Sequence, residues 1–175
     1  MTRPEPGEYA GYFAKYVERV PEGDIVAVLR AQLPETLAYY GAIPEEKTLH
    51  RYAPGKWSIK ENLVHISDSE RVMAYRALRF ARNDRTALPG FEQDDFVAAA
   101  DADARSWGSI LGEFDAVRRA TLALFEGLGK EAWTRSGTAN GNALSVRALA
   151  YVIAGHVIHH QAVVEEKYGV IRSSG

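Results

Sequence analysis

Three histidines lie close together near the end of the 175-residue sequence, in the segment His156-Val157-Ile158-His159-His160. If this segment is helical, each residue advances by about 100° around the axis, and His156 and His160 both lie within about 50° of an apolar stripe. The stripe consists of Leu149, Ile153, Val157 and Val164. His159 lies at its edge, about 110° away. The helix would therefore direct two imidazoles, one turn apart, into the core, where they could ligate one metal ion together.

Two explanations for this buried pair of histidines are open. A buried imidazole without a partner costs about 1–3 kcal/mol, so each ring needs a hydrogen bond or a metal ion. The spacing alone favours a metal site and a buried hydrogen-bond network equally. The sequence has no cysteine, which excludes thiolate zinc sites, iron–sulfur clusters, disulfides and a cysteine nucleophile. A metal site would need a further ligand from elsewhere, because two histidines rarely suffice.

More candidate residues gather in a second helical pattern, which runs from residue 58 to residue 82. His65 lies beside the apolar stripe of this pattern rather than at its centre. Asp68 follows it, and Glu70 projects into the middle of the stripe, where an unpaired carboxylate is costly. A buried ion pair is the favoured explanation for Glu70. A role as a metal ligand, a general base or the partner of a ligating histidine is the alternative.

Four segments repeat apolar residues at helical spacing and must position these side chains. They cover about residues 24–40, 58–82, 103–128 and 145–168. Ser58 and Glu61 form the pattern of a capping box at the start of the second segment. Ser145 and Gly169 mark the two ends of the fourth segment. Pro34 predicts a kink or a break in the first.

The expected architecture is an all-α four-helix bundle with long connecting loops. No segment shows the alternation and β-branched enrichment of a strand, so no sheet is expected. The connections span about 17–20 residues, and one contains a short helical pattern near residues 94–99. Residues 1–175 are expected to form a single domain. Residues 1–20 would be an N-terminal tail that packs on the body, because its aromatic side chains would otherwise be exposed.

Composition indicates an ordinary soluble globular protein, with 46% hydrophobic and 25% charged residues. The formal net charge of −2 gives no broad electrostatic reason to bind nucleic acid or an anionic membrane. The first residues lack the apolar stretch of a secretory signal, and no apolar run is long enough to span a bilayer. We therefore expect a cytoplasmic protein without nucleic-acid or membrane partners.

Two stretches of the sequence form a specific combination. The first is Tyr52-Ala53-Pro54-Gly55-Lys56-Trp57-Ser58-Ile59-Lys60-Glu61, followed by His65, Asp68 and Arg76. The second is Ala154-Gly155-His156, followed by His159 and His160. In this order and at these distances, they resemble the DinB/YfiT-like family of metalloenzymes. The similarity extends from about residue 24 to residue 168.

The resemblance implies a four-helix bundle, often a homodimer, that holds a divalent metal ion with three histidines. One histidine comes from the second helix and two come from the fourth. Carried over by position, they are His65, His156 and His160. Imidazole ligands suit several divalent metals, of which zinc and nickel are the favoured candidates.

A site with three histidines and an open position can lower the pKa of bound water to about 7, and can also lower that of a bound thiol. One hypothesis is hydrolysis by activated water. Val157 follows His156, so the usual helical glutamate base of zinc proteases is missing, and Asp68 or Glu70 would have to replace it. The slightly favoured hypothesis is transfer of a low-molecular-weight thiol to an electrophile, as in some relatives. A metal-stabilised binding protein without turnover is the third.

Overall fold

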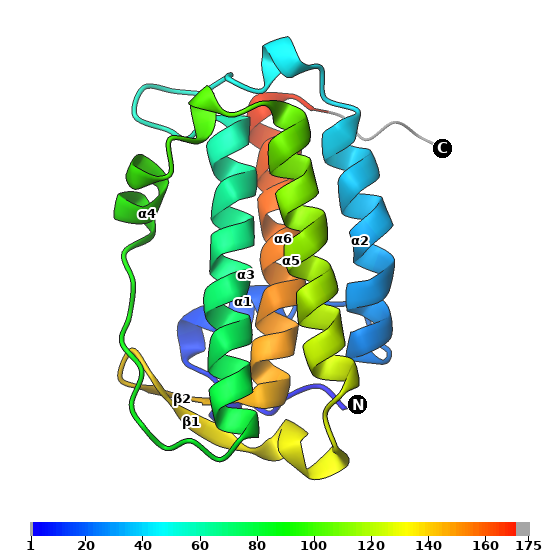
Figure 1. The fold of residues 1–175 in the computed structure, drawn as a ribbon, viewed down its shortest axis with the longest axis vertical. Helices are drawn as coiled ribbons and strands as arrows, with labels where there is room; N and C mark the ends of the chain where they lie inside the picture. Colours follow the sequence, from blue (N-terminus) through cyan, green and yellow to red (C-terminus); the bar gives the residue numbers. More distant parts are fainter. Residues whose placement is uncertain (1, 171–175) are drawn as a thin grey trace.

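Four long helices form the body of the protein (Figure 1). The computed structural model describes residues 2–170, and the four are α2 Ile25–Gly41, α3 Ile59–Ala81, α5 Trp107–Glu126 and α6 Val146–Tyr168. α3 packs against α5 and α6, and α2 packs against the same two helices. The predicted four-helix bundle is confirmed.

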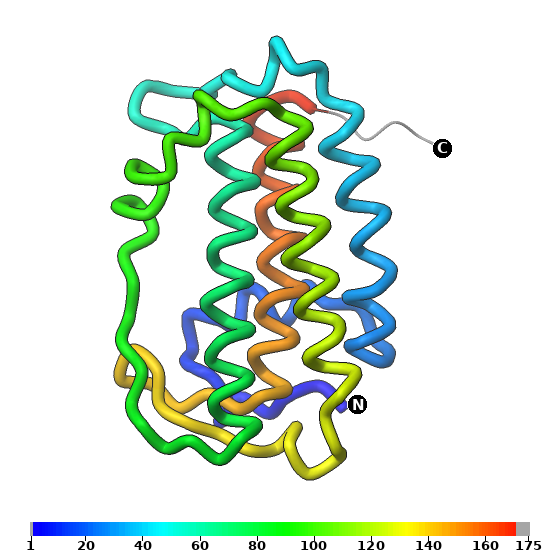
Figure 2. Tube along the Cα trace, viewed as in Figure 1, coloured from blue at the N-terminus to red at the C-terminus, as the bar shows by residue number. Residues whose placement is uncertain are grey.

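Shorter elements connect and cover the bundle. α1 Ala14–Val17 precedes α2, and α4 Gln93–Ala99 lies in the connection from α3 to α5, where the sequence predicts a short helix. Single 3₁₀ turns occupy Pro6–Glu8, Gly11–Phe13, Glu45–Lys47, Ala102–Ala104 and Lys130–Thr134. Figure 2 shows the connection from α3 to α5, in green, running along the outside of α3 from one end of the bundle to the other.

The predicted capping residues occupy the ends of the two helices that carry the histidines. Ser58 accepts a hydrogen bond from the Glu61 amide, and the Glu61 carboxylate accepts one from the Ser58 amide. The Ser145 hydroxyl accepts a hydrogen bond from the Ala148 amide, and Gly169 follows α6 with a φ of +69°. These caps satisfy amides that would otherwise lack partners, so they fix where α3 and α6 begin.

Two details of the predicted helices are wrong. The third helix begins at Trp107 rather than Asp103, because Ser106 caps it and Asp103 lies in a preceding 3₁₀ turn. Of the kink or break predicted at Pro34, the break is absent, because α2 continues through this residue. Pro34 is exposed, while Leu33 beside it is buried in the core. Packing of the apolar side therefore keeps the helix together despite the hydrogen bond that proline cannot donate.

A β-hairpin corrects the expectation that the chain contains no sheet. β1 Ser136–Ala139 pairs with β2 Asn142–Ser145 in antiparallel register. Asn140 and Gly141 both have positive φ, which suits the tight turn between two strands, and this dipeptide is the signal that the sequence analysis missed. Leu88 exchanges backbone hydrogen bonds with Thr138 and Asn140. The hairpin thus holds the connection from α3 to α5 against the end of the bundle.

The N-terminal residues lie against α6. Phe13 and Val17 are buried in the core cluster that α6 also lines. The Tyr16 backbone approaches α6 so closely that a Cβ atom at Gly155 would lie 2.0 Å from the Tyr16 carbonyl oxygen. Glycine therefore permits the crossing, and the crossing brings the Tyr16 ring to 5.2 Å from the His156 ring, centroid to centroid.

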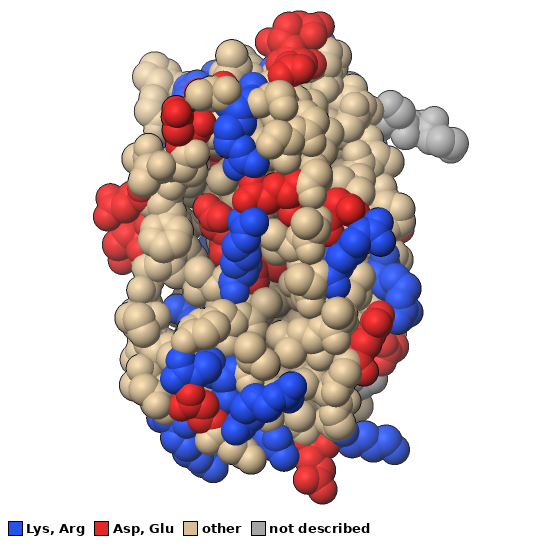
Figure 3. Space-filling model, in the orientation of Figure 1, with Lys and Arg blue, Asp and Glu red and all other residues tan. Residues whose placement is uncertain are grey.

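The surface carries both signs of charge. On the face drawn in Figure 3, both signs of charge are mixed in the upper and middle parts, and lysine and arginine side chains predominate at the lower end. This pattern agrees with the net charge of −2. No helix within residues 2–170 is both long enough and apolar enough to cross a membrane.

Candidate metal centre

His65 of α3 meets His156 and His160 of α6 between the two helices. Each offers one ring nitrogen, and the three nitrogens lie within 4.8 Å of one another. The Nε2 atoms of His65 and His156 are 3.2 Å apart. His65 is only 3% exposed, although its helical position suggested a place beside the apolar stripe. The structure thus brings together the three histidines that the family resemblance implies as ligands.

The burial of these imidazoles favours their neutral form. It lowers the pKa of His65 from its ordinary value of 6.5 to about 4, and lowers those of His156 and His160 well below that value. Positive charge on the neighbouring imidazoles acts in the same direction on His156 and His160. A neutral imidazole keeps a lone pair for a cation. The three residues therefore provide the donor atoms that a divalent metal ion requires.

The spacing of the nitrogens also fits a metal ion. In a tetrahedral zinc site with bonds of about 2.0–2.1 Å, neighbouring ligand nitrogens lie about 3.3 Å apart. The 3.2 Å contact between His65 and His156 already has this length, and side-chain adjustment can bring His160 closer. The cluster can therefore hold a divalent cation, whose identity three imidazoles do not determine.

Asn62 of α3 orients His160. Its side-chain amide lies 3.0 Å from His160 Nδ1 and also accepts a hydrogen bond from the Tyr40 hydroxyl at 3.0 Å. Exchanging the oxygen and nitrogen of the amide preserves both contacts, since a tyrosine hydroxyl can donate or accept. With the amide oxygen facing His160, Nδ1–H donates to it and Nε2 is free for a cation. Asn62 was not among the predicted site residues, although a polar residue one turn before His65 could have indicated it.

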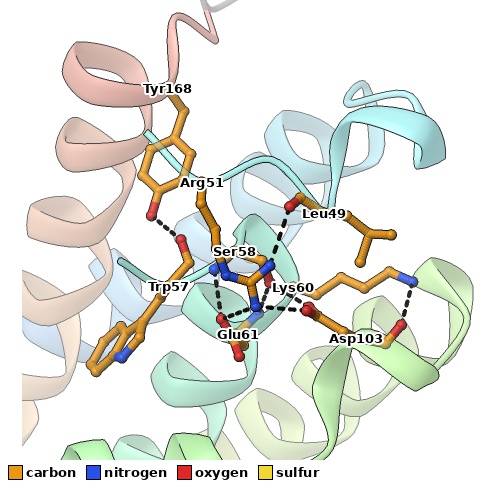
Figure 4. A network of polar contacts seen from close by, with 8 residues as sticks. All are labelled: Leu49, Arg51, Trp57, Ser58, Lys60, Glu61, Asp103 and Tyr168. Atoms are coloured by element: carbon orange, nitrogen blue, oxygen red, sulfur yellow. Dashed lines mark hydrogen bonds and ion pairs between the residues drawn. The ribbon is translucent and has the colours of Figure 1, made fainter. Parts of the chain in front are cut away.

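A polar network at the start of α3 holds Trp57 beside the histidines (Figure 4). The centroid of the Trp57 ring lies 4.7 Å from that of His65. The Tyr168 hydroxyl donates a hydrogen bond of 2.6 Å to the Trp57 carbonyl, which ties the loop to the end of α6. The rest of the network consists of Leu49, Arg51, Ser58, Lys60, Glu61 and Asp103. These contacts fix the loop and with it one aromatic wall of the cluster.

Comparison with known proteins agrees with this geometry. The family model of the DinB superfamily matches residues 29–164. The chain belongs to the DinB superfamily. No curated protein sequence matches it.

Two solved structures share the fold of this DinB-superfamily chain. YfiT from Bacillus subtilis is described as a probable metal-dependent hydrolase with an unusual four-helix bundle topology. It matches with a TM-score of 0.69 at 13% identity, over 97% of this chain and 95% of its own. A mycothiol-dependent maleylpyruvate isomerase matches with a TM-score of 0.68 at 11% identity. That match covers 89% of this chain and 63% of the isomerase.

The other histidines of the DinB-superfamily chain that sequence analysis considered lie outside the cluster of three. The His159 ring contacts the Tyr16 ring edge-on, with centroids 5.3 Å apart. Its Nδ1 atom is buried and has no hydrogen-bond partner within residues 2–170. His50 is exposed, as expected for a residue in the loop before α3.

Glu70 forms a buried ion pair with Arg118 of α5. Its two carboxylate oxygens accept hydrogen bonds of 2.8 Å from Arg118 Nε and Nη2. Arg118 Nη1 donates two more, each 3.1 Å long, to the Leu29 carbonyl and the Gln32 amide oxygen of α2. The ion pair that sequence analysis favoured for Glu70 is therefore present, and both oxygens are engaged in it.

Asp68 lies toward α5. It accepts a hydrogen bond of 3.1 Å from Arg71, which also pairs with Glu113 of α5. Burial raises the pKa of Asp68. Asp68 is not among the residues that line the cavity beside His65 and His156. Neither of the two predicted carboxylates thus joins the histidine cluster.

Two cavities border the histidine cluster. One has a volume of about 360 Å³, is lined by His65 and His156, and extends along α3 as far as Arg76. The other has a volume of about 490 Å³ and is lined by His160 and Trp57. Gln93 and Asp94 of α4 line both cavities. The connection from α3 to α5 therefore covers both approaches to the cluster.

Proposed function

We propose that this protein is a metal-dependent enzyme that transfers a low-molecular-weight thiol to an electrophilic small molecule. His65, His156 and His160 would hold the divalent cation, zinc or nickel, through neutral imidazoles. When bound, such a cation lowers the pKa of a thiol or of water at its open position. Three protein ligands suit a catalytic site, because a structural zinc site usually has four.

The observation that carries this proposal is the position of the two predicted bases. Arg118 engages both oxygens of Glu70, and Asp68 lies toward α5. Hydrolysis needs a group that accepts a proton from the attacking water. A thiol with a lowered pKa is already a nucleophile, so its transfer needs neither a base nor a protein cysteine. The arrangement therefore suits thiol transfer better than hydrolysis that uses Asp68 or Glu70 as the base.

The two cavities support a reaction with two substrates. One is lined by His65 and His156 and the other by His160, so each could hold one of the two substrates next to the histidine cluster. The maleylpyruvate isomerase, which has the same fold, is described as mycothiol-dependent. Hydrolysis is the alternative, because YfiT is described as a probable metal-dependent hydrolase.

The test combines metal analysis with two activity assays. Purified protein is expected to contain one zinc or nickel ion per chain. It should accelerate the reaction of small thiols with an alkylating agent or an epoxide above the uncatalysed rate. His156→Ala should remain folded by circular dichroism and lose both the metal and the acceleration. His159→Ala is the matched control, because it removes a neighbouring imidazole outside the cluster, and should keep both.

Three results would contradict the proposal. Acceleration that survives in His156→Ala would remove the metal from the mechanism. Thiol-independent cleavage of an ester or amide by the metal-loaded protein would establish the hydrolase instead. A loaded protein inactive in both assays would be a metal-stabilised binding protein.

A further inference from the structure

Arg76 of α3 lines the same cavity as His65 and His156. It follows His65 by eleven positions, which places it about 20° around α3 and about 16 Å along the axis. Both side chains therefore extend from the same face of the helix. Arg76 is only 4% exposed, and it lines the cavity together with Ser69 and Met73, which lie between it and His65.

The guanidinium of Arg76 has few protein partners. Its Nη2 donates a hydrogen bond of 2.9 Å to the Pro89 carbonyl. Its Nη1 lies 3.6 Å from the Met73 sulfur, and a thioether is a weak acceptor. The Phe91 ring centroid is 5.9 Å from the guanidinium carbon. Within residues 2–170, no carboxylate forms an ion pair with Arg76, so most of its five N–H groups lack a strong acceptor.

The other charged groups of the cavity leave the Arg76 charge uncompensated. Glu70 lines the cavity, but Arg118 neutralises it. Glu92 and Asp94 line the cavity from the α4 side and are exposed to solvent, and Lys15 is an exposed cation on the N-terminal side. A guanidinium stays protonated even where burial lowers its pKa, as it does for Arg76. A buried cation without a counter-ion is costly unless a ligand supplies one.

We propose that Arg76 binds the carboxylate of the electrophilic substrate, in the cavity that His65 and His156 line and about three helical turns from His65. That the bound anion is the electrophilic substrate rests on the proposed function. That Arg76 binds an anion at all rests on the surroundings of Arg76. A carboxylate carries one charge and two coplanar oxygens, which match one guanidinium, while a phosphate dianion would need further cations. Tyr12, Phe13 and Phe91 line the same cavity and suit an apolar or aromatic body. The substrate class is therefore a carboxylic acid whose reactive carbon lies several bonds from its carboxylate.

The experiment measures binding of benzoate, benzamide and phenylphosphonate by calorimetry. It uses the full chain as purified and again after treatment with a chelator, so that carboxylate binding to metal is recognised. Benzoate should bind at least about tenfold more tightly than the uncharged, equally shaped benzamide, because a hydrogen bond to a charged group strengthens the contact. Arg76→Met should abolish this preference with and without metal. Arg82→Met removes an exposed arginine from the end of the same helix and should leave it unchanged.

Arg76→Lys guards against a variant that does not fold. It keeps the charge and loses the planar fork, so it should retain part of the preference for benzoate. Equal benzoate affinity in the wild type and in folded Arg76→Met would overturn the proposal. Tighter binding of phenylphosphonate than of benzoate would overturn the choice of carboxylate. Failure of the proposed function can be distinguished from failure of this proposal. His156→Ala tests thiol transfer, whereas binding of benzoate to chelator-treated protein tests Arg76 without the metal.

Discussion

Two buried arginines of this bundle differ in how completely the protein satisfies them. Arg118 is 0% exposed and donates to two oxygens of Glu70, to one backbone carbonyl and to one side-chain amide. Gln32, the amide partner, in turn donates to the Ala154 carbonyl of α6. The network therefore joins α2, α3, α5 and α6. Arg76, on the cavity side of α3, has one carbonyl and one thioether.

The number of hydrogen bonds that a buried charged side chain makes distinguishes a structural role from a functional one. A buried charge such as Arg118, with four of its five N–H groups engaged, specifies how helices pack, and its loss leaves the partner unpaired. Buried groups with unused atoms beside a cavity, such as Arg76 and the three histidines, are available to a ligand. Burial alone, which both arginines share, does not distinguish the two roles.

The largest expected effect concerns the buried ion pair between Arg118 and Glu70. Arg118→Met leaves the Glu70 carboxylate buried without its partner and should lower the free energy of unfolding by about 3–5 kcal/mol. Arg76→Met removes an equally long buried side chain but leaves no carboxylate unpaired. It should therefore lower the free energy of unfolding clearly less than Arg118→Met. Urea denaturation of both variants measures the difference. Equal losses would mean that the hydrogen-bond count does not separate the two arginines.

The second prediction concerns the orientation of His160. Asn62→Leu removes the amide next to His160 Nδ1 and should weaken metal binding about 10–100-fold, because groups behind a ligating histidine fix its tautomer. Tyr40→Phe is the matched control, since it removes only the hydroxyl behind Asn62 and should change the affinity much less. Competition with a chelator measures both values. Wild-type affinity in Asn62→Leu would exclude this role.

The third prediction tests the crossing of the N-terminal segment over α6. Gly155→Ala places a methyl group against the Tyr16 carbonyl and should destabilise the protein by about 1–3 kcal/mol, the usual effect of overpacking. Gly112→Ala in α5, where nothing lies within 4 Å of the added carbon, should instead stabilise by up to about 1 kcal/mol. Thermal denaturation compares the two. A Gly155→Ala protein as stable as Gly112→Ala would rule out this close approach.

The smallest effect comes from an ion pair near the surface and depends on pH. The Arg147 guanidinium, followed by Ser145, lowers the pKa of Glu8 from 4.5 to about 2. The native state therefore binds this proton less readily than the unfolded chain, so the contribution is complete above about pH 4.5 and is lost as pH falls toward 2. Glu8→Gln should be less stable than the wild type near neutral pH, and the two should converge in acid. Denaturation curves with a gap independent of pH would contradict the shifted pKa.

Local sequence patterns were sufficient for most of the helices. The caps at Ser58 and Ser145 and the apolar period predicted the starts of α3 and α6, because both depend on residues within one or two turns. The hairpin was missed because its strands have four residues each, too few for alternation to be recognised. The Asn140-Gly141 turn was its only strong signal.

The sequence by itself determined the helices and the pairing of His156 with His160, since residues four apart on one helix must share a face. The tertiary structure decided what each buried side chain meets. His65 reaches His156 across 91 residues of chain, and Glu70 reaches Arg118 across 48. It also decided that Arg76 has no carboxylate partner among the described residues. Such pairings depend on how whole helices rotate and pack against one another, which the periodicity of a single helix does not contain.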